Sequence, residues 1–369
     1  MLMQSIFLPS SVNSISIKIY LPNLPLWNSL VFYERFFYQL ALQIIFMQYR
    51  TFGRTGWKVS EIGYGMWGMA GWTGSEEKEV NEALDKAIEL GCNFFDTAWA
   101  YGDGLSENIL NKTIRRHTDK RLYVATKIPP KNRKWPSKPG FKLEEVFPAD
   151  YIIEYTERSL QNLGVETIDL QQFHVWEDGW ANNDEWKEAI TQLTKQGKVQ
   201  AWGVSVNRWE PDNCLDTLRT GLIDAVQVIY NIFDQSPKDN LFPLCREKDI
   251  AVIARVPFDE GTLTGTFTKD TVFPANDWRA SYFVPENLHA SVEHADALKP
   301  LIPAGSTMAE LALRFILSNP DIATTIPGMR RLKNVQINMQ SSDGKGLPAD
   351  LLKELEAHRW DRQPTEWSQ

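Results

Sequence analysis

From Tyr49 onward the sequence repeats one pattern, in which a short apolar run and a turn are followed by a helical stretch with one apolar face. The apolar runs are SEIGYG, NFFDTA, LYVATK, IDLQQFHV, VQAWGVSV, AVQVIY, IAVIARV and IATTIP. The helical patterns include EEKEVNEALDKAIELG, ADYIIEYTERSLQNLG, NDEWKEAITQLTKQGK and TMAELALRFILSNP. Short apolar runs bounded by turns predict buried strands, and apolar residues three and four apart predict the helices that cover them.

The number of repeats favours one of the two architectures that such alternation allows. Eight strand and helix units over about 290 residues favour a closed (β/α)8 barrel over an open, doubly wound sheet. We therefore predict an α/β fold of the TIM-barrel type, with an N-terminal hairpin and long loops at the C-terminal face of the barrel.

The first 46 residues differ from the rest of the chain. Their only charged residues are Lys18, Glu34 and Arg35, and they lack the basic start and compact apolar core of a signal peptide. Their most apolar stretch, residues 36–46, is shorter than the roughly 20 residues that cross a bilayer. We expect residues 1–46 to be a dispensable extension without a membrane span, or alternatively a docking segment. Residues 47–369 are expected to form the barrel.

Charge and cysteine content argue against a nucleic-acid surface and against a structural metal site. A formal net charge of −8 argues against nucleic-acid binding, which depends on clustered positive charge. The cysteines, Cys92, Cys214 and Cys245, are far apart and have neither CxxC spacing nor a histidine cluster near them. We predict reduced thiols in a cytoplasmic protein that has no metal site.

A barrel places its active site at the C-terminal ends of its strands, so polar residues that end the apolar runs are the candidates for function. Each of these residues could instead have a purely structural role. A lysine at a strand end can extend its amine to solvent, and a histidine in the core can have its hydrogen bonds satisfied there. Their expected convergence at one rim favours an active site. These residues are Asp96, Tyr101, Lys127, His174, Ser205, Gln227 and Arg255.

The set Asp96, Tyr101, Lys127 and His174 resembles the catalytic tetrad of the aldo-keto reductases. The resemblance extends from about residue 50 to residue 362, and the closing RWDR is similar to a bacterial branch of the family. Its other motifs are DTAxxYGxGxSE, ATK, GVS, PFxxGxLxG and IPGMR. The resemblance implies a reductase that transfers hydride from a nicotinamide cofactor to a small carbonyl substrate.

Hydride transfer to a carbonyl builds negative charge on its oxygen, so a proton donor has to lie within hydrogen-bond distance. Tyr101 is the expected acid, and the Lys127 ammonium would lower the phenol pKa from its usual value of about 10. Asp96 would hold this ammonium in place and keep it protonated. His174 would donate a hydrogen bond to the substrate oxygen.

The resemblance also implies a cofactor pocket. Ser205 and Gln227 would hold the nicotinamide carboxamide, whereas Asn207 lies one position later than the asparagine of the usual pair, because Val206 follows Ser205. Trp67 is explained equally well by packing at the barrel rim. The remaining implied cofactor residues are Gly65, Met66, Trp67, Asp96, Val256, Pro257, Phe258, Gly261, Leu263, Gly265, Gly328, Arg330, Asn334 and Asn338.

The stretch MRRLKNVQIN, residues 329–338, favours NADPH over NADH. A helix start already attracts an anion, and Arg330, with Arg331 beside it, adds charge that suits a 2′-phosphate. Arginine pairs are more often solvated surface, but this pair lies where the family binds that phosphate. Ile337 replaces a glutamate that contacts adenine in relatives.

Arg255 departs from the family pattern, since many relatives have a tyrosine stacked on the nicotinamide there. A guanidinium also stacks on rings but is positive, so it would disfavour NADP⁺ relative to NADPH. Alternatively, Arg255 pairs with the cofactor pyrophosphate or a carboxylate.

Two long loops, residues 129–148 and 258–285, should form the substrate pocket. The aromatic residues of these loops, and Trp176 outside them, either contact substrate or anchor the loops. The sequence does not decide between these roles. They are Trp135, Phe141, Trp176, Trp278 and Phe283.

Two other classes of function fit part of the pattern. Potassium-channel β subunits are similar barrels that bind NADPH and act mainly as regulatory partners. An aldolase-like barrel could use Lys127 as a Schiff base, but this leaves Tyr101 and IPGMR unexplained. The sequence leaves the oligomeric state and the identity of the substrate open.

Overall fold

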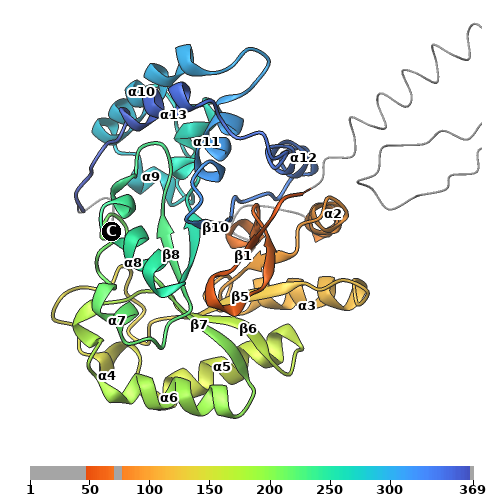
Figure 1. Cartoon of the computed structure of the whole chain (residues 1–369), viewed down its shortest axis with the longest axis vertical. Coiled ribbons are helices and arrows are strands. Elements are labelled where there is room, and N and C mark those ends of the chain that lie inside the picture. The colour runs from red at the N-terminus through yellow and green to blue at the C-terminus, as the bar shows by residue number, and fades with distance from the viewer. Residues whose placement is uncertain (1–46, 70–76, 366–369) are drawn as a thin grey trace, which may run out of the picture. The chain divides into compact units, whose positions relative to one another are not determined.

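The computed structural model describes residues 47–69 and 77–365, so the predicted extension of residues 1–46 lies outside the described residues. Each of the eight apolar runs contains one strand of the main sheet (Figure 1). The strands are β3 (Tyr64–Gly65), β4 (Phe94–Asp96), β5 (Tyr123–Ile128), β6 (Ile168–Phe173), β7 (Val199–Ser205), β8 (Ala225–Ile229), β9 (Ala251–Arg255) and β10 (Ile322–Thr325).

Neighbouring strands are parallel and follow the order of the sequence from β3 to β10. The sheet closes because Gly63 N–H donates to the Thr325 carbonyl at 2.8 Å and Gly65 N–H to the Pro327 carbonyl at 3.1 Å. A Cβ at Gly65 would lie 2.5 Å from the Ile326 carbonyl oxygen, so this closure requires glycine. The predicted (β/α)8 barrel is confirmed.

The stretch GYGMWG, residues 63–68, has the GxGxxG spacing of a dinucleotide-binding turn. Its fold is different, because β3 lies inside the stretch and a short 3-10 helix, η2 (Trp67–Met69), follows. The close approach of β3 to its neighbours explains its first two glycines. A Cβ at Gly63 would lie 3.0 Å from the Phe94 ring and from Thr324 Oγ1.

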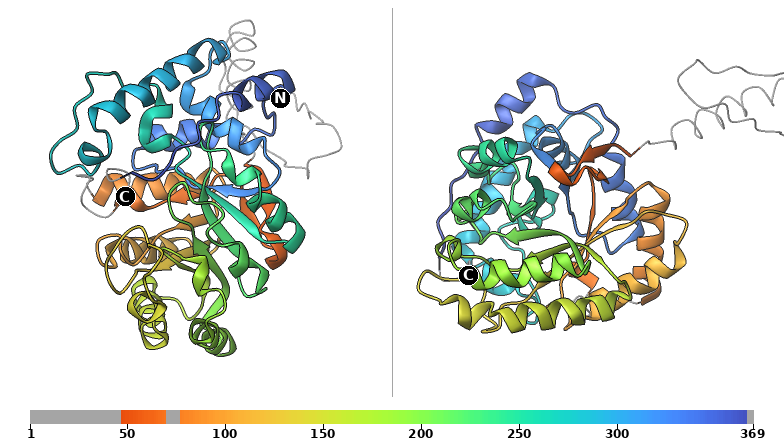
Figure 2. Two further views of the ribbon diagram at one scale, coloured as in Figure 1. Left: turned by 90° about the vertical axis from the view of Figure 1, so that its left-hand side faces the viewer. Right: turned by 60° about the horizontal axis from the view of Figure 1, so that its bottom comes forward.

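The helices surround the strands, as Figure 2 shows from two sides. The four predicted patterns form α2 (Glu77–Glu89), α5 (Ala149–Leu163), α6 (Asp184–Lys195) and α11 (Met308–Leu317). In α2 the predicted apolar face, which includes Val80, Leu84 and Ile88, is buried. The other described helices are α3 (Leu105–Arg116), α4 (Leu143–Val146), α7 (Leu215–Arg219), α8 (Leu241–Lys248), α9 (Arg279–Tyr282), α10 (Pro285–Leu298), α12 (Leu332–Gln340) and α13 (Ala349–Glu356).

The predicted N-terminal hairpin consists of the antiparallel strands β1 (Tyr49–Thr51) and β2 (Lys58–Ser60). The turn between them carries Phe52, whose buried ring lies 5.4 Å from that of Phe94. Small residues from the barrel strands, such as Ala125 and Ala201, pack in the same cluster and leave room for these rings. The hairpin therefore covers the end of the barrel opposite the predicted active site.

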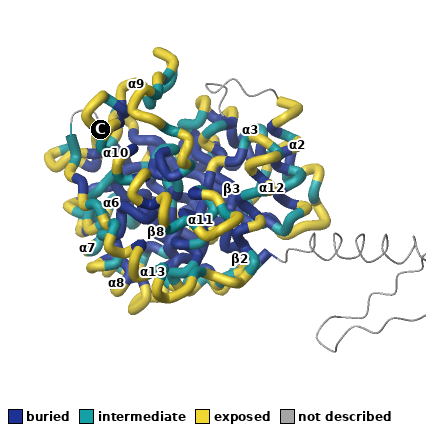
Figure 3. Tube along the Cα trace, turned by 90° about the horizontal axis from the view of Figure 1, so that it is seen from above, coloured by how far each residue is buried: buried dark blue, intermediate teal, exposed yellow. Residues whose placement is uncertain are grey.

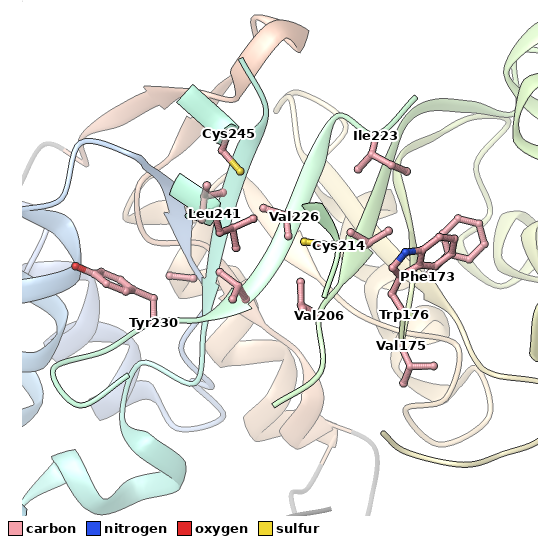
Figure 4. Close-up of a cluster of buried hydrophobic side chains, with 14 of the residues drawn as sticks. Phe173, Val175, Trp176, Val206, Cys214, Ile223, Val226, Tyr230, Leu241 and Cys245 are labelled. Carbon is pink, nitrogen blue, oxygen red and sulfur yellow. The ribbon is translucent and has the colours of Figure 1, made fainter. Parts of the chain in front are cut away.

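Buried segments lie at the centre of the protein and exposed segments on its outer surface (Figure 3). Figure 4 shows part of the apolar layer between the strands and the outer helices, in which Phe173 packs against Trp176 and both belong to the same cluster as Val226 and Leu241. All three cysteines are free and buried, and burial raises the pKa of the Cys245 thiol to about 12. Within the described ranges no helix is long and apolar enough to cross a membrane.

Candidate active site

An ion pair between Asp96 and Lys127 lies at the C-terminal ends of β4 and β5. Lys127 Nζ lies 2.5 Å from Asp96 Oδ1 and donates a second hydrogen bond, of 2.8 Å, to the Thr97 carbonyl. The side chains of Asp96 and Lys127 are 3% and 1% exposed. Charges this deeply buried are tolerated only when paired, so each residue fixes the position of the other.

Two amide side chains hold the second oxygen of Asp96. Gln172 Nε2 on β6 donates to Asp96 Oδ2 at 3.1 Å, and Gln227 Nε2 on β8 donates to the same oxygen at 2.8 Å. Gln172 was missed by the sequence analysis, although a glutamine within an apolar strand, beside Lys127 in register, was a signal that could have identified it. Asp96 thus accepts hydrogen bonds from three strands of the barrel.

Tyr101 lies in the turn between β4 and α3, with Lys127 Nζ 5.2 Å from the centre of its ring. Its ring meets that of His174 edge to face, with 5.6 Å between the centres. Lys127 lowers the phenol pKa as expected, but burial has the larger effect, and the pKa of Tyr101 is raised overall. The hydroxyl is therefore protonated at neutral pH.

His174 follows β6 and completes the group that the sequence analysis placed at one rim. Burial, followed by the charges of Lys127 and Arg255, holds the pKa of His174 well below its ordinary value. The ring is neutral at neutral pH, and its Nδ1 has no hydrogen-bond partner among the described residues. A neutral imidazole can donate one hydrogen bond without adding charge to the site.

Ser205 ends β7 and lies opposite Gln227 in the parallel register. Asn207, two residues later, is directed to the neighbouring loops. Its Nδ2 donates to Glu177 Oε1 at 3.1 Å, to Glu210 Oε2 at 3.0 Å and to the Ser137 carbonyl at 3.3 Å. Its buried Oδ1 has no partner among the described residues.

Arg255 ends β9 and turns toward β7. Its Nη2 donates to the Val206 carbonyl at 2.9 Å. Burial, followed by the charge of Arg208, lowers the pKa of Arg255 to about 10, so the guanidinium is still charged at neutral pH. The phenol of Tyr101 is among the groups that raise this pKa.

The loop that follows β9 contains the motif PFxxGxLxG and has an unusual backbone. Val256, Asp259 and Glu260 have φ values of 56°, 46° and 57°, in the left-handed region that favours glycine. Each such residue costs roughly 1–3 kcal/mol and persists only where surrounding contacts hold it. Gly261 and Gly265 also have positive φ, whereas Leu263 is fully buried and anchors the loop.

Positive charge gathers before α12, on the neighbouring side of the barrel mouth. Burial and the charges of Arg331 and Arg279 lower the pKa of Arg330. A Cβ at Gly68 would lie 3.9 Å from Arg330 Cδ, so Arg330 lies beside the loop after β3. Within α12 Asn334 is exposed, whereas Asn338 is buried.

The aromatic residues of the long loops fall into two groups. Trp135 is 41% exposed and meets His174 edge to face at 5.8 Å, and Trp278 meets Trp67 in the same way at 5.8 Å. Trp176 is fully buried and donates to Thr217 Oγ1, and Phe283 packs in a small buried cluster. Trp135 is thus exposed beside His174, whereas Trp176 and Phe283 are buried. Trp278 is half-buried and packs against the cluster that contains Phe283.

Among residues 47–69 and 77–365, no cluster of three or more histidine, cysteine or carboxylate side chains could hold a metal ion.

Comparisons with known proteins identify the family of this chain. The chain is 29% identical over 316 residues to the uncharacterized oxidoreductase YqkF of Bacillus subtilis, covering 85% of this chain and 96% of the relative. It is 27% identical over 320 residues to the NADH-specific methylglyoxal reductase of Escherichia coli, covering 82% and 96% of the two chains. The holo form of the aldo-keto reductase AKR11C1 from Bacillus halodurans superposes with a TM-score of 0.69 at 25% identity, covering 88% of this chain and 100% of that one. The model of the aldo/keto reductase family matches residues 61–359, and the chain belongs to this family.

Proposed function

We propose that the protein reduces aldehydes or ketones to alcohols with NADPH, and that Tyr101 is the general acid. The observation that carries this proposal is the position of Lys127 Nζ, which lies 2.5 Å from Asp96 Oδ1 and 5.2 Å from the centre of the Tyr101 ring. A buried ammonium between a carboxylate and a phenol is suited to stabilising a phenolate. Family membership supports oxidoreductase chemistry on carbonyl compounds.

The residues at the rim fit a nicotinamide dinucleotide. Space for a ligand is left at Gly328, where an added Cβ would meet nothing within 4 Å. Ser205 and Gln227 offer hydroxyl and amide groups suited to a carboxamide, and Arg330 offers charge suited to a phosphate. When bound, the reduced cofactor supplies the hydride.

The protein side chains supply the proton and the orientation. Tyr101 donates its hydroxyl proton to the substrate oxygen as negative charge develops there. Lys127 then stabilises the phenolate, and Asp96 holds Lys127 in position. The neutral His174 donates a hydrogen bond to the same substrate oxygen, and Trp135 beside it borders the substrate.

A turnover assay tests the proposal. The protein is mixed with NADPH and with each member of a panel of aldehydes and ketones, and the absorbance of the reduced nicotinamide is followed. We expect absorbance loss that depends on both the protein and a carbonyl compound. Cofactor binding without turnover on any of them would favour a regulatory cofactor-binding protein instead.

Arg330→Ala tests the cofactor preference. We expect the dissociation constant for NADPH to rise at least about tenfold, because a charge-assisted hydrogen bond to the 2′-phosphate is lost. NADH lacks this phosphate and serves as the internal control, so its dissociation constant should change little. Both constants can be measured by quenching of tryptophan fluorescence. Equal losses for both cofactors would assign Arg330 a structural role.

Arg255→Tyr tests the effect of a positive charge near the nicotinamide. The guanidinium donates a hydrogen bond to the Val206 carbonyl, next to Ser205, and interacts electrostatically with Tyr101. We therefore place it at the nicotinamide end of the pocket. Removing it should tighten NADP⁺ binding about tenfold while changing NADPH less, since only the oxidised ring is positive. Dissociation constants for both redox forms measure this. A parallel loss for both forms would indicate contact with the phosphates.

A further inference from the structure

A buried ion cluster lies beside the loop that follows β9, outside the group around Lys127. Arg362 Nη2 donates to Asp234 Oδ2 at 2.5 Å and to Asp259 Oδ1 at 2.7 Å. All three side chains are 2–6% exposed. Asp234 belongs to the loop after β8 and Asp259 to the loop after β9, so one guanidinium from the C-terminal segment joins two loops of the barrel mouth.

The C-terminal segment is itself fixed at this place. Residues 357–365 follow α13, form no helix or strand and run down the side of the barrel (Figure 1). Trp360 N–H donates to the Phe233 carbonyl at 2.9 Å, and the Trp360 ring stacks on His294 at 4.1 Å. The Arg362 guanidinium lies 4.7 Å from the Trp360 ring centre and 4.8 Å from that of Trp209. The guanidinium therefore has a dedicated site between two aromatic rings.

The cluster holds the strained part of the β9 loop. Asp259, which Arg362 binds directly, has a positive φ of 46°. Asn231 Nδ2 donates both to Asp234 Oδ2 at 2.9 Å and to the carbonyl of Val256 at 3.1 Å, and Val256 also has a positive φ. Glu260, the third such residue, pairs with Arg208 at 2.6 Å. Left-handed backbone at these residues requires such contacts.

We propose that Arg362 is a positioning residue for cofactor binding, which sets the shape of the β9 loop against the cofactor. The inference rests on the proposed function for the identity of the ligand. Two carboxylates that share a buried site repel each other unless a counter-charge lies between them. Arg362 supplies this charge, so residues 256–264 take their shape only when the C-terminal segment is in place.

Arg362→Met, which keeps most of the side-chain volume, is the first test. Without Arg362, Asp234 and Asp259 stay buried without their counter-charge, which disfavours the shape of the loop that binds the cofactor. The dissociation constant for NADPH should therefore rise at least about tenfold. The turnover number at saturating NADPH should stay within about twofold, because Arg362 touches none of the proposed catalytic residues. Arg359→Met is the matched control, since Arg359 pairs with Asp239 and Asp361 at the surface and should change neither value.

The double variant Arg362→Met, Asp234→Asn distinguishes repulsion between the two carboxylates from a nonspecific loss of structure. It removes one of the two repelling carboxylates, so we expect it to recover most of the NADPH affinity that the single variant loses. Wild-type affinity in the single variant, or no recovery in the double variant, would overturn the proposal.

Hydrogen exchange in the protein without cofactor gives a readout that does not depend on the proposed function. Backbone amides of residues 256–264 should exchange faster in Arg362→Met than in wild type, and the double variant should restore their protection. If the wild type bound no NADPH, the proposed function would fail while this measurement still tested the loop. Unchanged exchange in Arg362→Met would overturn the positioning role.

Discussion

Replacing Tyr101 by phenylalanine is expected to lower the rate of carbonyl reduction at least about a hundredfold, the usual scale for loss of a general acid. The substitution removes only the hydroxyl, so the ring should keep its edge-to-face contact with His174. Because the pKa of Tyr101 is raised, the wild-type phenol carries its proton throughout the neutral range. Steady-state rates with saturating NADPH measure the loss.

The control for this variant is its affinity for NADPH, which should be nearly unchanged, since the hydroxyl supplies a proton and not a cofactor contact. Fluorescence titration of wild type and Tyr101→Phe provides the comparison. Turnover at the wild-type rate would remove Tyr101 from the mechanism, and another acid would then have to be sought at the rim.

Lys127→Met is expected to reduce both activity and stability. Activity should fall by more than about a hundredfold, because no cation remains to stabilise the phenolate. The free energy of unfolding should fall by about 3–5 kcal/mol, since Asp96 stays buried without its counter-charge. Initial rates and denaturant unfolding measure the two effects.

A control variant and a double variant show whether the loss of stability comes from the buried ion pair. Lys198→Met removes a partly exposed ion pair with Glu157, and its unfolding free energy should change by less than about 1 kcal/mol. Adding Asp96→Asn to Lys127→Met should recover stability without recovering activity, because it removes the unpaired charge but restores no cation. A Lys127→Met protein with wild-type stability would contradict the ion-pair account.

The strands were predictable because the sequence pattern that indicates a strand lies within the strand and its adjacent turns. A buried parallel strand is a short apolar run between turns, and each of the eight runs contains one strand. The closure at Gly65 was not predictable, because its reason is the Ile326 carbonyl, which lies far away in the sequence. The GxGxxG spacing of residues 63–68 illustrates the same limit, since contacts with distant strands account for its first two glycines.

The position of the candidate residues was predictable where they end strands. Asp96, Lys127 and His174 lie at the rim because parallel strands of a barrel all end at the same face, and Tyr101 follows in the adjacent turn. The direction of the Tyr101 pKa was not predictable, since burial outweighs the Lys127 charge by an amount that depends on packing.

Side chains that act across long sequence distances were missed. Gln172 reaches Asp96 across 76 positions, and Arg362 reaches Asp259 across 103 positions. From the sequence alone, the closing RWDR is only a motif similar to a bacterial branch of the family. Packing likewise decided between the two roles of the loop aromatics, which placed Trp176 in the core and Trp135 beside His174.

Isotope transfer tests most directly the claim that the protein transfers hydride from NADPH to a carbonyl carbon. NADPH carrying deuterium at the hydride position of the nicotinamide is mixed with the wild-type protein and a carbonyl compound that is turned over, and the alcohol product is analysed by mass spectrometry and NMR. The account predicts that deuterium arrives at the former carbonyl carbon, mole for mole with the NADPH oxidised, and that Tyr101→Phe slows this transfer without changing where the label arrives. Oxidation of NADPH without deuterium in the product, or no oxidation with any carbonyl compound, would contradict it.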